Sequence, residues 1–228
     1  MIIELLQPVY GNEAGSVRSL SAYLDNETAD LDVTFSIEVR NGRFVVAIDG
    51  EDEEICRNFL YAEFGKPMTP DDLFPGAVVR GYISKIEEDR IIVSCGTELA
   101  IPASALKPLG AGNAGQIAAR FGMIPYQPVS FVVGDDMKTA AFTKEQVDLW
   151  WSWLKSPTDR LILNNATRSQ VKAALKKKGH GRDVYGVEKL GLLESVIVCK
   201  EKTDGPGIVA SVGKLLKSNI GVIIGTKK

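Results

Sequence analysis

The sequence predicts an α+β fold in three parts, because strand-like and helix-like patterns alternate along it in three distinct arrangements. Residues 1–74 follow a βαββα pattern, residues 75–143 contain five short strand patterns and one helix, and residues 144–228 begin with a helix followed by βαββαβ. An apolar fraction of 45% with 25% charged residues is ordinary for a globular protein, so a packed core is expected without disulfides or metals.

The first part, residues 1–74, opens with the strand pattern IIELLQPVY, after which Val17, Leu20 and Leu24 recur at helical spacing. DVTFSIEVR alternates apolar and polar residues, and the turn signal NGR separates it from FVVAIDG, which predicts a hairpin. The acids from Asp49 to Asp52 can cap a final helix whose apolar face holds Ile55, Phe59, Leu60 and Phe64. This order is the greater part of a ferredoxin-like unit.

The second part, residues 75–143, follows a linker, GKPMTPDDLFPG, that is rich in proline and glycine. Its first three strand patterns are AVVRGYISKI, RIIVSC and ELAIP, and the small-residue segment GAGNAGQIAARFG predicts a short helix. PVSFVVG and MKTAAFT supply a fourth and a fifth strand. Five short strands with a helix between the third and the fourth is the order of an OB-fold barrel.

The third part, residues 144–228, begins with TKEQVDLWWSWLKSP, a helix that is apolar nearly all round and is therefore expected to be buried between domains. The strand DRLILNN follows, and Thr167 caps a helix that Gly179 ends. Two strands, DVYGVEKLG and SVIVCK, a helix from about Gly207 to Lys217, and the strand NIGVIIG complete a βαββαβ unit. Because the first and third parts share an element order, we expect two ferredoxin-like units to flank the barrel.

Charge is unevenly distributed along the chain, although the net charge is only −2. Residues 1–74 hold 5 Lys/Arg and 15 Asp/Glu, residues 75–143 hold 6 and 6, and residues 144–228 hold 16 and 8, so the charge runs from −10 through 0 to +8. Such a gradient makes the third part a candidate anion binder and the first part a candidate surface for a basic protein partner. The structural alternative is that the two ends attract each other within the fold.

Three further features of the sequence indicate the compartment of the protein and exclude some classes of enzyme. They are the cysteines, the amino terminus and the missing motifs. Cys56, Cys95 and Cys199 are far apart and set among Ile, Val or Leu, which is typical of buried reduced thiols and predicts a cytoplasmic protein. The first residues lack a secretory leader, and no window approaches the roughly 18 apolar residues of a spanning helix, so we expect no membrane association. Walker, Rossmann and HExxH patterns are missing and there is a single histidine, so we expect no cofactor and no metal.

The stretch from Pro75 to Leu106 resembles the RNA-binding OB repeat first described in ribosomal protein S-one. The likeness is carried by Pro75-Gly76, Val78, Val79 and Gly81, by the strand IIVSCG, and by the segment IPASAL. It covers under a third of the chain and implies an RNA-binding barrel. In that family a Phe-rich second strand stacks bases, each for roughly 1–3 kcal/mol. The corresponding strand here, Arg90 to Cys95, carries no aromatic residue.

The early strands of the barrel carry a second, weaker candidate contact surface. Tyr82 is the only ring on the early strands, and the cations near it are Arg80, Lys85 and Arg90. Together they predict a small basic surface with one stacking residue. The equally weighted alternative is that Tyr82 packs on the barrel wall and the cations are merely solvated.

The arrangement of the whole chain resembles an archaeal conserved family of unknown function. Members have an S-one-like central region and a Thr-Asp-x-x-Gly-Ile stretch near the end, which Thr203 to Ile208 match here. The resemblance implies an archaeal, cytoplasmic protein with an informational role, and it implies no activity.

The densest group of cations in the sequence lies in ATRSQVKAALKKKGHGRD. Arg168, Lys172 and Lys176 are spaced i, i+4, i+8 on one helix face, and the helix end is crowded by Lys177, Lys178 and Arg182. Repeated cations of this kind bind phosphate backbones because each contact releases condensed counterions. Cations at a helix C-terminus also complement the dipole by roughly 0.3–1 kcal/mol each. Six cations exceed what the dipole requires, so we predict nucleic-acid contact here.

Two further stretches of the sequence contain candidate site residues. TDGPGIVASVGKLL resembles the ligand-binding turn of the amino-acid-sensing ACT family, which makes Asp204, Gly205 and Gly207 candidate ligand-binding residues. That turn follows the first strand in the ACT family and the third strand here, so a plain capped turn with Pro206 in the first helical turn is the favoured alternative. His180 lies between two glycines, and a surface phosphate contact or no role is favoured over catalysis.

The favoured hypothesis is a non-catalytic RNA-binding or ribonucleoprotein-associated factor of the transcription or translation machinery. A protein-interaction adaptor, in which the barrel is purely structural, is the main alternative. A small-molecule-sensing regulator that uses Asp204 to Gly207 is the third.

Overall fold

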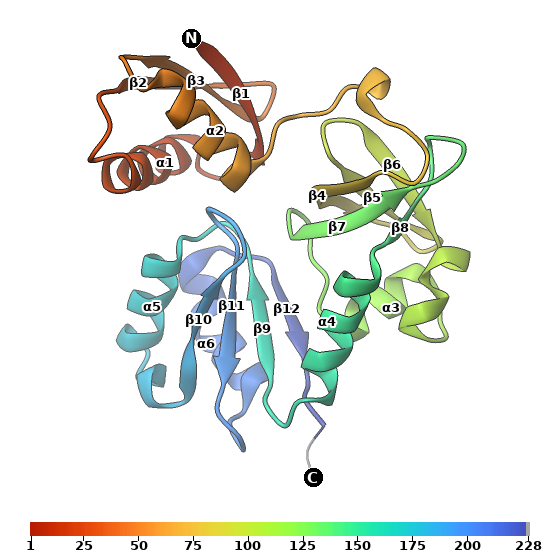
Figure 1. Ribbon diagram of the computed structural model, residues 1–228. Coiled ribbons are helices and arrows are strands. Elements are labelled where there is room, and N and C mark those ends of the chain that lie inside the picture. Colours follow the sequence, from red (N-terminus) through yellow and green to blue (C-terminus); the bar gives the residue numbers. More distant parts are fainter. Residues whose placement is uncertain (227–228) are drawn as a thin grey trace. The chain divides into compact units, whose positions relative to one another are not determined.

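The computed structural model describes residues 1–226 (Figure 1). These residues form a mixed α+β fold, as predicted, with six α-helices and three antiparallel sheets. The chain divides into two compact units, Met1–Met68 and Thr69–Lys228. Within the described residues, no helix has the length and apolarity needed to cross a membrane.

The first unit follows the predicted element order. It contains β1 (Ile2–Pro8), α1 (Glu13–Glu27), β2 (Thr34–Arg40), β3 (Arg43–Asp49) and α2 (Glu53–Phe64), and its sheet order is β1-β3-β2. The hairpin between β2 and β3 turns at Asn41 and Gly42, with φ of 50° and 71°. Positive φ at both central residues is the condition for the tight hairpin turn that Asn-Gly favours.

The core of the first unit lies between one face of this sheet and the two helices. On β3, Phe44, Val46 and Ile48 are buried, whereas β2 alternates between half-buried and exposed residues. Tyr23 of α1 packs on Phe59 and Phe64 of α2, at ring-centroid distances of 6.2 and 5.3 Å, so the helices lie side by side. The opposite face of the sheet carries the polar residues of β2.

The start of α2 differs in detail from the prediction. Asp52 occupies the N-cap position, but its side chain makes no capping hydrogen bond to the helix. Instead, its Oδ2 accepts a hydrogen bond from the backbone N–H of Asp32 at 2.9 Å. The carboxylate therefore ties the helix start to the segment before β2.

The second unit begins with a five-stranded sheet. Its strands are β4 (Val78–Ile86), β5 (Arg90–Ser94), β6 (Glu98–Pro102), β7 (Pro128–Val133) and β8 (Ala140–Phe142), in the order β6-β5-β4-β7-β8. A 3-10 helix (Ala103–Leu109) and α3 (Ala114–Arg120) connect β6 to β7. The prediction of one short helix here is therefore extended by a 3-10 segment.

The predicted closed barrel is not formed in the described residues. The edge strands β6 and β8 meet at a single isolated parallel bridge, Ala100 to Thr139, supported by a hydrogen bond from Ala100 N–H to the Lys138 carbonyl at 2.9 Å. The physical reason is length, because β8 has three residues and cannot extend a ladder along β6.

Helix α4 (Lys144–Lys155) packs differently from the prediction of burial on all sides. Trp150 is fully buried and packs edge-on against Phe142, with centroids 4.7 Å apart, while Trp153 is buried near Arg160 at the start of the next sheet. Leu149, however, is 41% exposed. One side of α4 therefore faces solvent and the other bridges the two sheets of the second unit.

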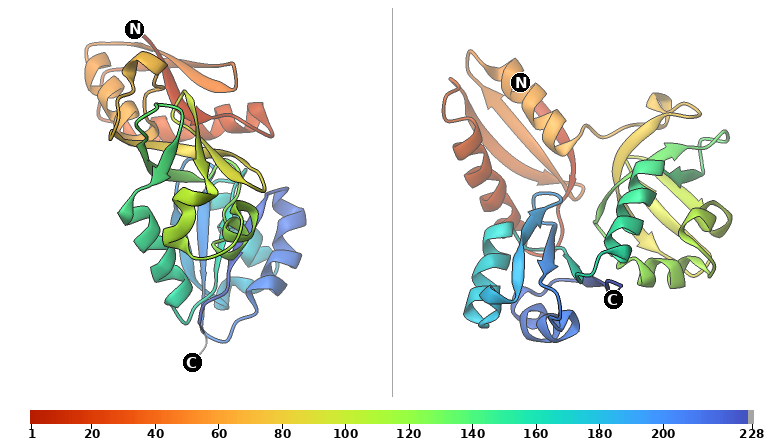
Figure 2. Two further views of the ribbon diagram at one scale, coloured as in Figure 1. Left: turned by 90° about the vertical axis from the view of Figure 1, so that its right-hand side faces the viewer. Right: turned by 60° about the horizontal axis from the view of Figure 1, so that its bottom comes forward.

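The four-stranded sheet completes the second unit with the predicted βαββαβ order. It contains β9 (Arg160–Leu163), α5 (Arg168–Lys177), β10 (Val184–Lys189), β11 (Ser195–Cys199), α6 (Gly205–Leu216) and β12 (Ile220–Ile223), and the strand order is β10-β11-β9-β12. Helices α5 and α6 lie next to each other on one face (Figure 2). The core between them and the sheet includes Leu161, Leu163, Val171, Ile197 and Val212.

All three cysteines are buried, which leads to a prediction about their reactivity. Burial raises the pKa of the Cys199 thiol to about 11, with repulsion from Asp159 and Asp183 adding to it, and burial also raises the pKa of Cys56. The native thiols of Cys56 and Cys199 should therefore stay protonated at pH 8, where only the thiolate reacts. We expect Ellman's reagent to react at least about ten-fold more slowly with the native protein than with the protein unfolded in guanidinium. The unfolded protein should release three equivalents.

The same pKa shift predicts a pH dependence of stability. Because the native pKa of Cys199 lies above the unfolded value, the unfolded state loses this proton first, and the free energy of unfolding should fall as the pH rises toward 11. Rapid reaction of native Cys199 at pH 8, identified by mass spectrometry of the labelled peptides, would contradict both expectations.

Candidate nucleic-acid interface

Helix α5 begins with the cap that the sequence predicts. Thr167 Oγ1 accepts a hydrogen bond from the Gln170 N–H at 3.3 Å, and Gln170 Oε1 accepts one from the Thr167 N–H at 2.8 Å. This reciprocal capping box sets the start of the helix. The buried residues Val171, Ala174 and Leu175 then face the sheet, so helical periodicity turns the lysines outward.

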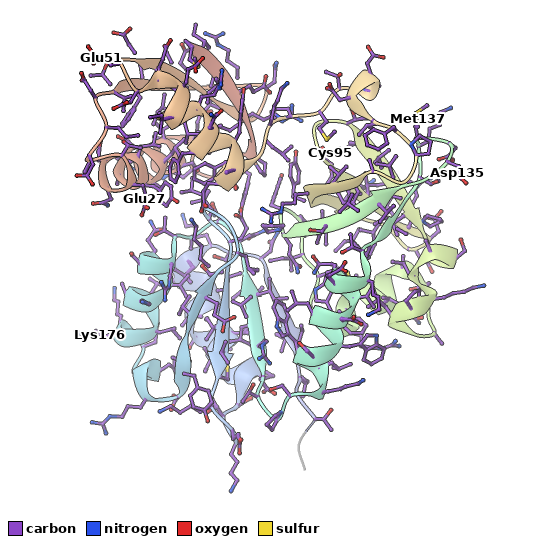
Figure 3. The ribbon with its side chains drawn as sticks, in the orientation of Figure 1. Glu27, Glu51, Cys95, Asp135, Met137 and Lys176 are labelled. Carbon is purple, nitrogen blue, oxygen red and sulfur yellow. The ribbon has the colours of Figure 1, made fainter. Side chains whose placement is uncertain are left out.

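The outward surface of α5 and the following turn form a cluster of exposed cations. Helix α5 ends at Lys177 with Lys178 as its C-cap residue, and Gly179, whose φ of 82° is left-handed, leads into a 3-10 turn, His180–Arg182. Figure 3 shows Lys176 projecting from the side of α5 turned away from the strands. Within residues 1–226, no acidic side chain pairs with the five exposed cations, which we call the basic cluster: Lys172, Lys176, Lys177, Lys178 and Arg182.

Arg168 differs from the rest of the predicted cationic face. Its Nε donates a hydrogen bond to the backbone carbonyl of Val187 on β10 at 2.6 Å. Arg168 is nevertheless an exposed residue, and its guanidinium has further N–H groups that this bond does not use. Arg168 thus links α5 to the edge strand and is less free to follow a ligand than the lysines.

His180 lies in a line of hydrogen bonds beside the basic cluster. Its Nδ1 is 2.9 Å from Asp183 Oδ2, and its Nε2 is 2.8 Å from Ser211 Oγ on α6. This is the hydrogen-bond order of a hydrolase triad. Ser211, however, lies inside α6, where neighbouring N–H groups are already bonded within the helix and cannot form an oxyanion hole. Both ring nitrogens are occupied, so His180 fastens the turn to α6 in this arrangement.

The five-stranded sheet carries a second, smaller surface. Arg80 is exposed and Tyr82 half-buried on β4, and the ring of Tyr82 lies 6.3 Å from that of Tyr126, tilted by 32°. Tyr126 was not among the sequence candidates. It lies in the loop before β7 with φ of 66°, and its N–H donates to the Ile83 carbonyl at 2.7 Å, which returns the loop to β4. This surface therefore carries two neighbouring, half-buried rings rather than one.

The other two cations predicted for this surface are paired. Glu87 accepts hydrogen bonds from Lys85 Nζ at 2.5 Å and from Arg90 Nε at 2.6 Å. Lys85 and then Arg90 hold the pKa of this carboxyl below its ordinary value. Phosphate contact by either cation would have to compete with Glu87, so Arg80 is the better-placed cation of this group.

The Asp204 turn places two carboxylates at the start of α6. Asp204 is at the N-cap position without a side-chain cap bond, and Pro206 lies in the first turn. A Cβ at Gly207 would lie 2.5 Å from Asp204 Oδ2, and one at Gly205 would lie 2.9 Å from Oδ2 of the buried Asp159. The glycines make room for carboxylates that already complement the helix dipole and would repel an anionic ligand. Ligand binding by Asp204, Gly205 and Gly207 stays a prediction.

Comparison with known families accounts for almost the entire sequence. Residues 2–70 match the DUF2110 N-terminal domain, residues 73–154 the DUF2110 central domain, and residues 158–224 the DUF2110 C-terminal domain. A search of curated proteins found no match. These family descriptions name domains and no activity.

Proposed function

The chain belongs to the DUF2110 family in all three of its domains, and from its surface chemistry we propose that it is a non-catalytic RNA-binding or ribonucleoprotein-associated factor. The proposal uses surface chemistry because the domain descriptions name no activity. The observation that carries the proposal is the basic cluster on α5 and its following turn. Its five cations are exposed and lack acidic partners in residues 1–226. Uncompensated cations in a row are what a phosphate backbone neutralises.

The spacing of the cluster suits a chain of phosphates. Lys172 and Lys176 are four residues apart, so they are separated by about 6 Å along the axis at 1.5 Å per residue. Lys177, Lys178 and Arg182 continue the positive surface around the helix end. Such contacts position a nucleic acid without reading its sequence. The basic cluster therefore supplies affinity, and any base preference comes from elsewhere.

In this proposal the five-stranded sheet is an S-one-like OB module that contributes stacking. Two observations support it: the strand order β6-β5-β4-β7-β8, and the parallel bridge from Ala100 to Thr139 that brings the first and last strands of that order together. Tyr82, Tyr126 and Arg80 form the contact surface, which favours unpaired bases because their faces are accessible. The four-stranded sheet, with its βαββαβ order, serves as a ferredoxin-like support for α5.

Fluorescence anisotropy with labelled short RNAs, single-stranded and duplex, across a potassium chloride series tests the proposal. The variant replaces Lys172, Lys176, Lys177 and Lys178 with glutamate. Each phosphate contact on a single strand contributes about 0.7 to the slope of log K against log salt, so losing four contacts should reduce that slope by up to about 2.8. Wild-type binding should weaken steeply with salt, and the variant should bind little at any salt.

A matched control separates a local site from net charge. Glutamate at Lys66, Lys107, Lys138 and Lys144, all exposed, changes the net charge equally and leaves α5 untouched. This control should retain most of the binding. Replacing Tyr82 and Tyr126 with leucine should weaken binding and leave the salt slope unchanged, because stacking releases no counterions. Absence of wild-type binding at the lowest salt, or equal losses in both lysine variants, would reject the proposal.

A further inference from the structure

The sheet of the first unit has an edge along β1, where the outward backbone groups of Ile2 and Glu4 have no hydrogen-bond partner within residues 1–226. Strand β1 pairs with β3 on one side, and its other side is an edge of the sheet. The Met1 carbonyl accepts from the Ile48 N–H of β3 at 2.8 Å, so odd-numbered residues direct their backbone groups toward β3. Ile2 and Glu4 therefore direct theirs outward. The Leu6 N–H confirms the alternation, because it donates outward to the Gly65 carbonyl at 2.9 Å.

The four-stranded sheet of the second unit shows how an equivalent edge is filled. The first unit and the four-stranded-sheet part of the second unit share the order βαββα, and β9 occupies in the four-stranded sheet the place that β1 occupies in the three-stranded sheet. The outer side of β9 is covered by β12, which pairs Gly221 with Ile162 and Val222 with Leu161. In the first unit, the chain after α2 contributes the Gly65 carbonyl, which accepts from the Leu6 N–H, and forms no strand beside β1. The place of a fourth strand beside β1 is therefore left open in Met1–Met68.

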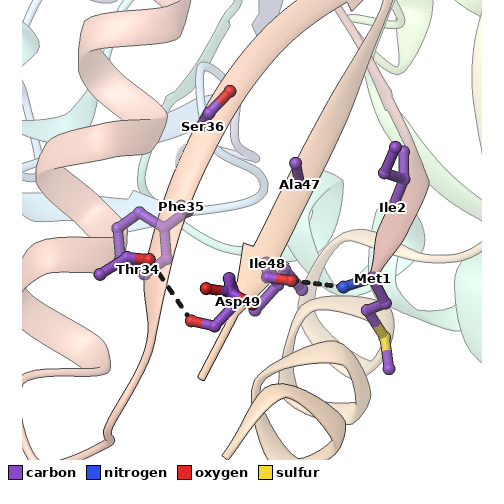
Figure 4. Close-up of a pocket in the computed structure, with 8 residues that line it drawn as sticks. All are labelled: Met1, Ile2, Thr34, Phe35, Ser36, Ala47, Ile48 and Asp49. Atoms are coloured by element: carbon purple, nitrogen blue, oxygen red, sulfur yellow. Dashed lines mark hydrogen bonds between the residues drawn. The ribbon is translucent and has the colours of Figure 1, made fainter.

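The side chains next to this edge offer an apolar contact. Ile2 is 69% exposed and stands in register with Ala47 of β3 and, across it, Ser36 of β2. These three residues border an open hollow of about 420 Å³ at this end of the sheet (Figure 4). An apolar residue on an added strand, opposite Ile2, would cover Ile2 and the rim of the hollow. Main-chain bonds and one side-chain pocket are the two elements of recognition by strand addition.

Charge identifies the kind of segment that fits. Met1–Met68 contains 5 Lys/Arg and 13 Asp/Glu, a net charge of −8. Helix α2, which contacts β1, carries Glu54 and Glu63 as well as Glu53, which pairs with the N-terminal amine at 2.7 Å. Glu4 lies on the edge strand itself and pairs with Arg43 at 3.1 Å, so the attraction of a basic segment comes from the net charge of the unit rather than from Glu4 alone. We propose that β1 accepts an extended segment of a partner protein, with alternating basic and apolar residues, as the fourth strand of this sheet.

Charge also disfavours a second copy of this chain as the occupant. Pairing β1 with β1 of another copy would bring two units of net charge −8 together and place the Glu4 side chains near each other. Like charges across adjacent strands are destabilising. A basic segment meets the opposite situation, because its lysines or arginines approach an acidic surface while its backbone pairs with Ile2 and Glu4.

The first test is amide hydrogen exchange by NMR, with a short peptide of alternating lysine and valine as the probe. In the free full-length protein, the Ile3 N–H should be protected and the N–H groups of Ile2 and Glu4 should exchange quickly. Addition of the peptide should slow exchange at Ile2 and Glu4 by at least about ten-fold, because both become hydrogen-bonded. A peptide of alternating glutamate and valine is the charge control and should leave both unchanged.

Two changes remove backbone hydrogen bonds of the added strand, one made in the protein and one made in the peptide. Glu4→Pro deletes an outward N–H and keeps the ladder to β3, since proline is tolerated at edge positions whose N–H faces solvent. Glu4→Gln is its matched control for the lost charge. N-methylation of alternate residues of the peptide deletes the donors on the other side and leaves the protein unaltered. We expect Glu4→Pro and the N-methylated peptide each to weaken binding at least about ten-fold, and Glu4→Gln by less.

The outcomes decide the proposal in either direction. Slowed exchange at Ile2 and Glu4, together with weaker binding of the N-methylated peptide, supports strand addition even if Glu4→Pro fails to fold. Equal binding of both peptides, exchange slowed elsewhere, or no binding at millimolar peptide overturns it. The proposal would also be overturned if the protein self-associates, if Glu4→Pro abolishes this self-association, and if the peptide does not compete with it. The occupant of the edge would then be a second copy of the chain. None of these results depends on RNA binding by α5.

Discussion

Replacing Trp150 with alanine is expected to lower the free energy of unfolding of the second unit by about 3–5 kcal/mol. Trp150 is fully buried, packs edge-on against Phe142 with centroids 4.7 Å apart, and lies 6.4 Å from the ring of Phe121. Its removal leaves a cavity where α4 meets the five-stranded sheet, and the rigid neighbours cannot close it. Guanidinium unfolding followed by tryptophan fluorescence measures the loss, since the remaining tryptophans, Trp151 and Trp153, lie on the same helix.

Phenylalanine at the same position separates ring packing from the indole N–H. The Trp150 Nε1 is buried and has no hydrogen-bond partner within residues 1–226, a situation that costs about 1–3 kcal/mol. Trp150→Phe keeps an aromatic ring and removes this penalty, so we expect it to cost less than about 1.5 kcal/mol. Equal destabilisation by both substitutions would show that the volume of the indole, rather than its aromatic contacts, determines stability at this position.

Replacing Gly221 with alanine is expected to destabilise the second unit by about 3 kcal/mol, at the upper end of what overpacking costs. A Cβ at Gly221 would lie 1.8 Å from the carbonyl oxygen of Gly122 and 2.5 Å from its carbonyl carbon. Backbone lies on both sides of this contact, because Gly221 pairs with Ile162 in the four-stranded sheet and Gly122 follows α3. Relief of the clash therefore requires β12 to leave β9 or the α3 segment to move.

Gly181→Ala provides the matched control. A Cβ at Gly181 would meet no atom within 4 Å, and its φ is not in the left-handed region. The same chemical change should therefore alter the unfolding free energy by less than about 0.5 kcal/mol. Thermal and guanidinium unfolding of both variants, measured in parallel, compare the two positions. Comparable stability of the two variants would mean that the contact between Gly221 and Gly122 is easily adjusted.

Much of the local structure follows from short-range chemistry. The hairpin at Asn41 and Gly42, the capping box from Thr167 to Gln170 and the left-handed Gly179 all depend on residues within about four positions of one another, which the sequence displays directly. The outward direction of Lys172 and Lys176 follows equally from helical period, because Val171 and Leu175 must face the sheet. These features were predictable without coordinates.

The candidate site was only partly predictable for the opposite reason. Arg168 bonds to the Val187 carbonyl, and Tyr82 meets Tyr126, across 19 and 44 positions of sequence. The pairing of Lys85 and Arg90 with Glu87 is local, but it depends on which direction each side chain takes around the turn. The sequence shows which residues are charged or aromatic. The paths of the loops determine which of these residues pair with each other and which can contact a ligand.

The sequence by itself determined the α+β class, the order of most elements and the outward lysines of α5, because periodicity and capping act within a few residues. Only the tertiary structure decided that the five-stranded sheet stays unclosed within residues 1–226, that His180 is held between Asp183 and Ser211, and that β1 lies at the edge of its sheet. These features depend on which strands become neighbours and how far they run together. Strand pairing is determined by packing between segments that are distant in sequence. The free energy of that packing cannot be inferred from a local sequence pattern.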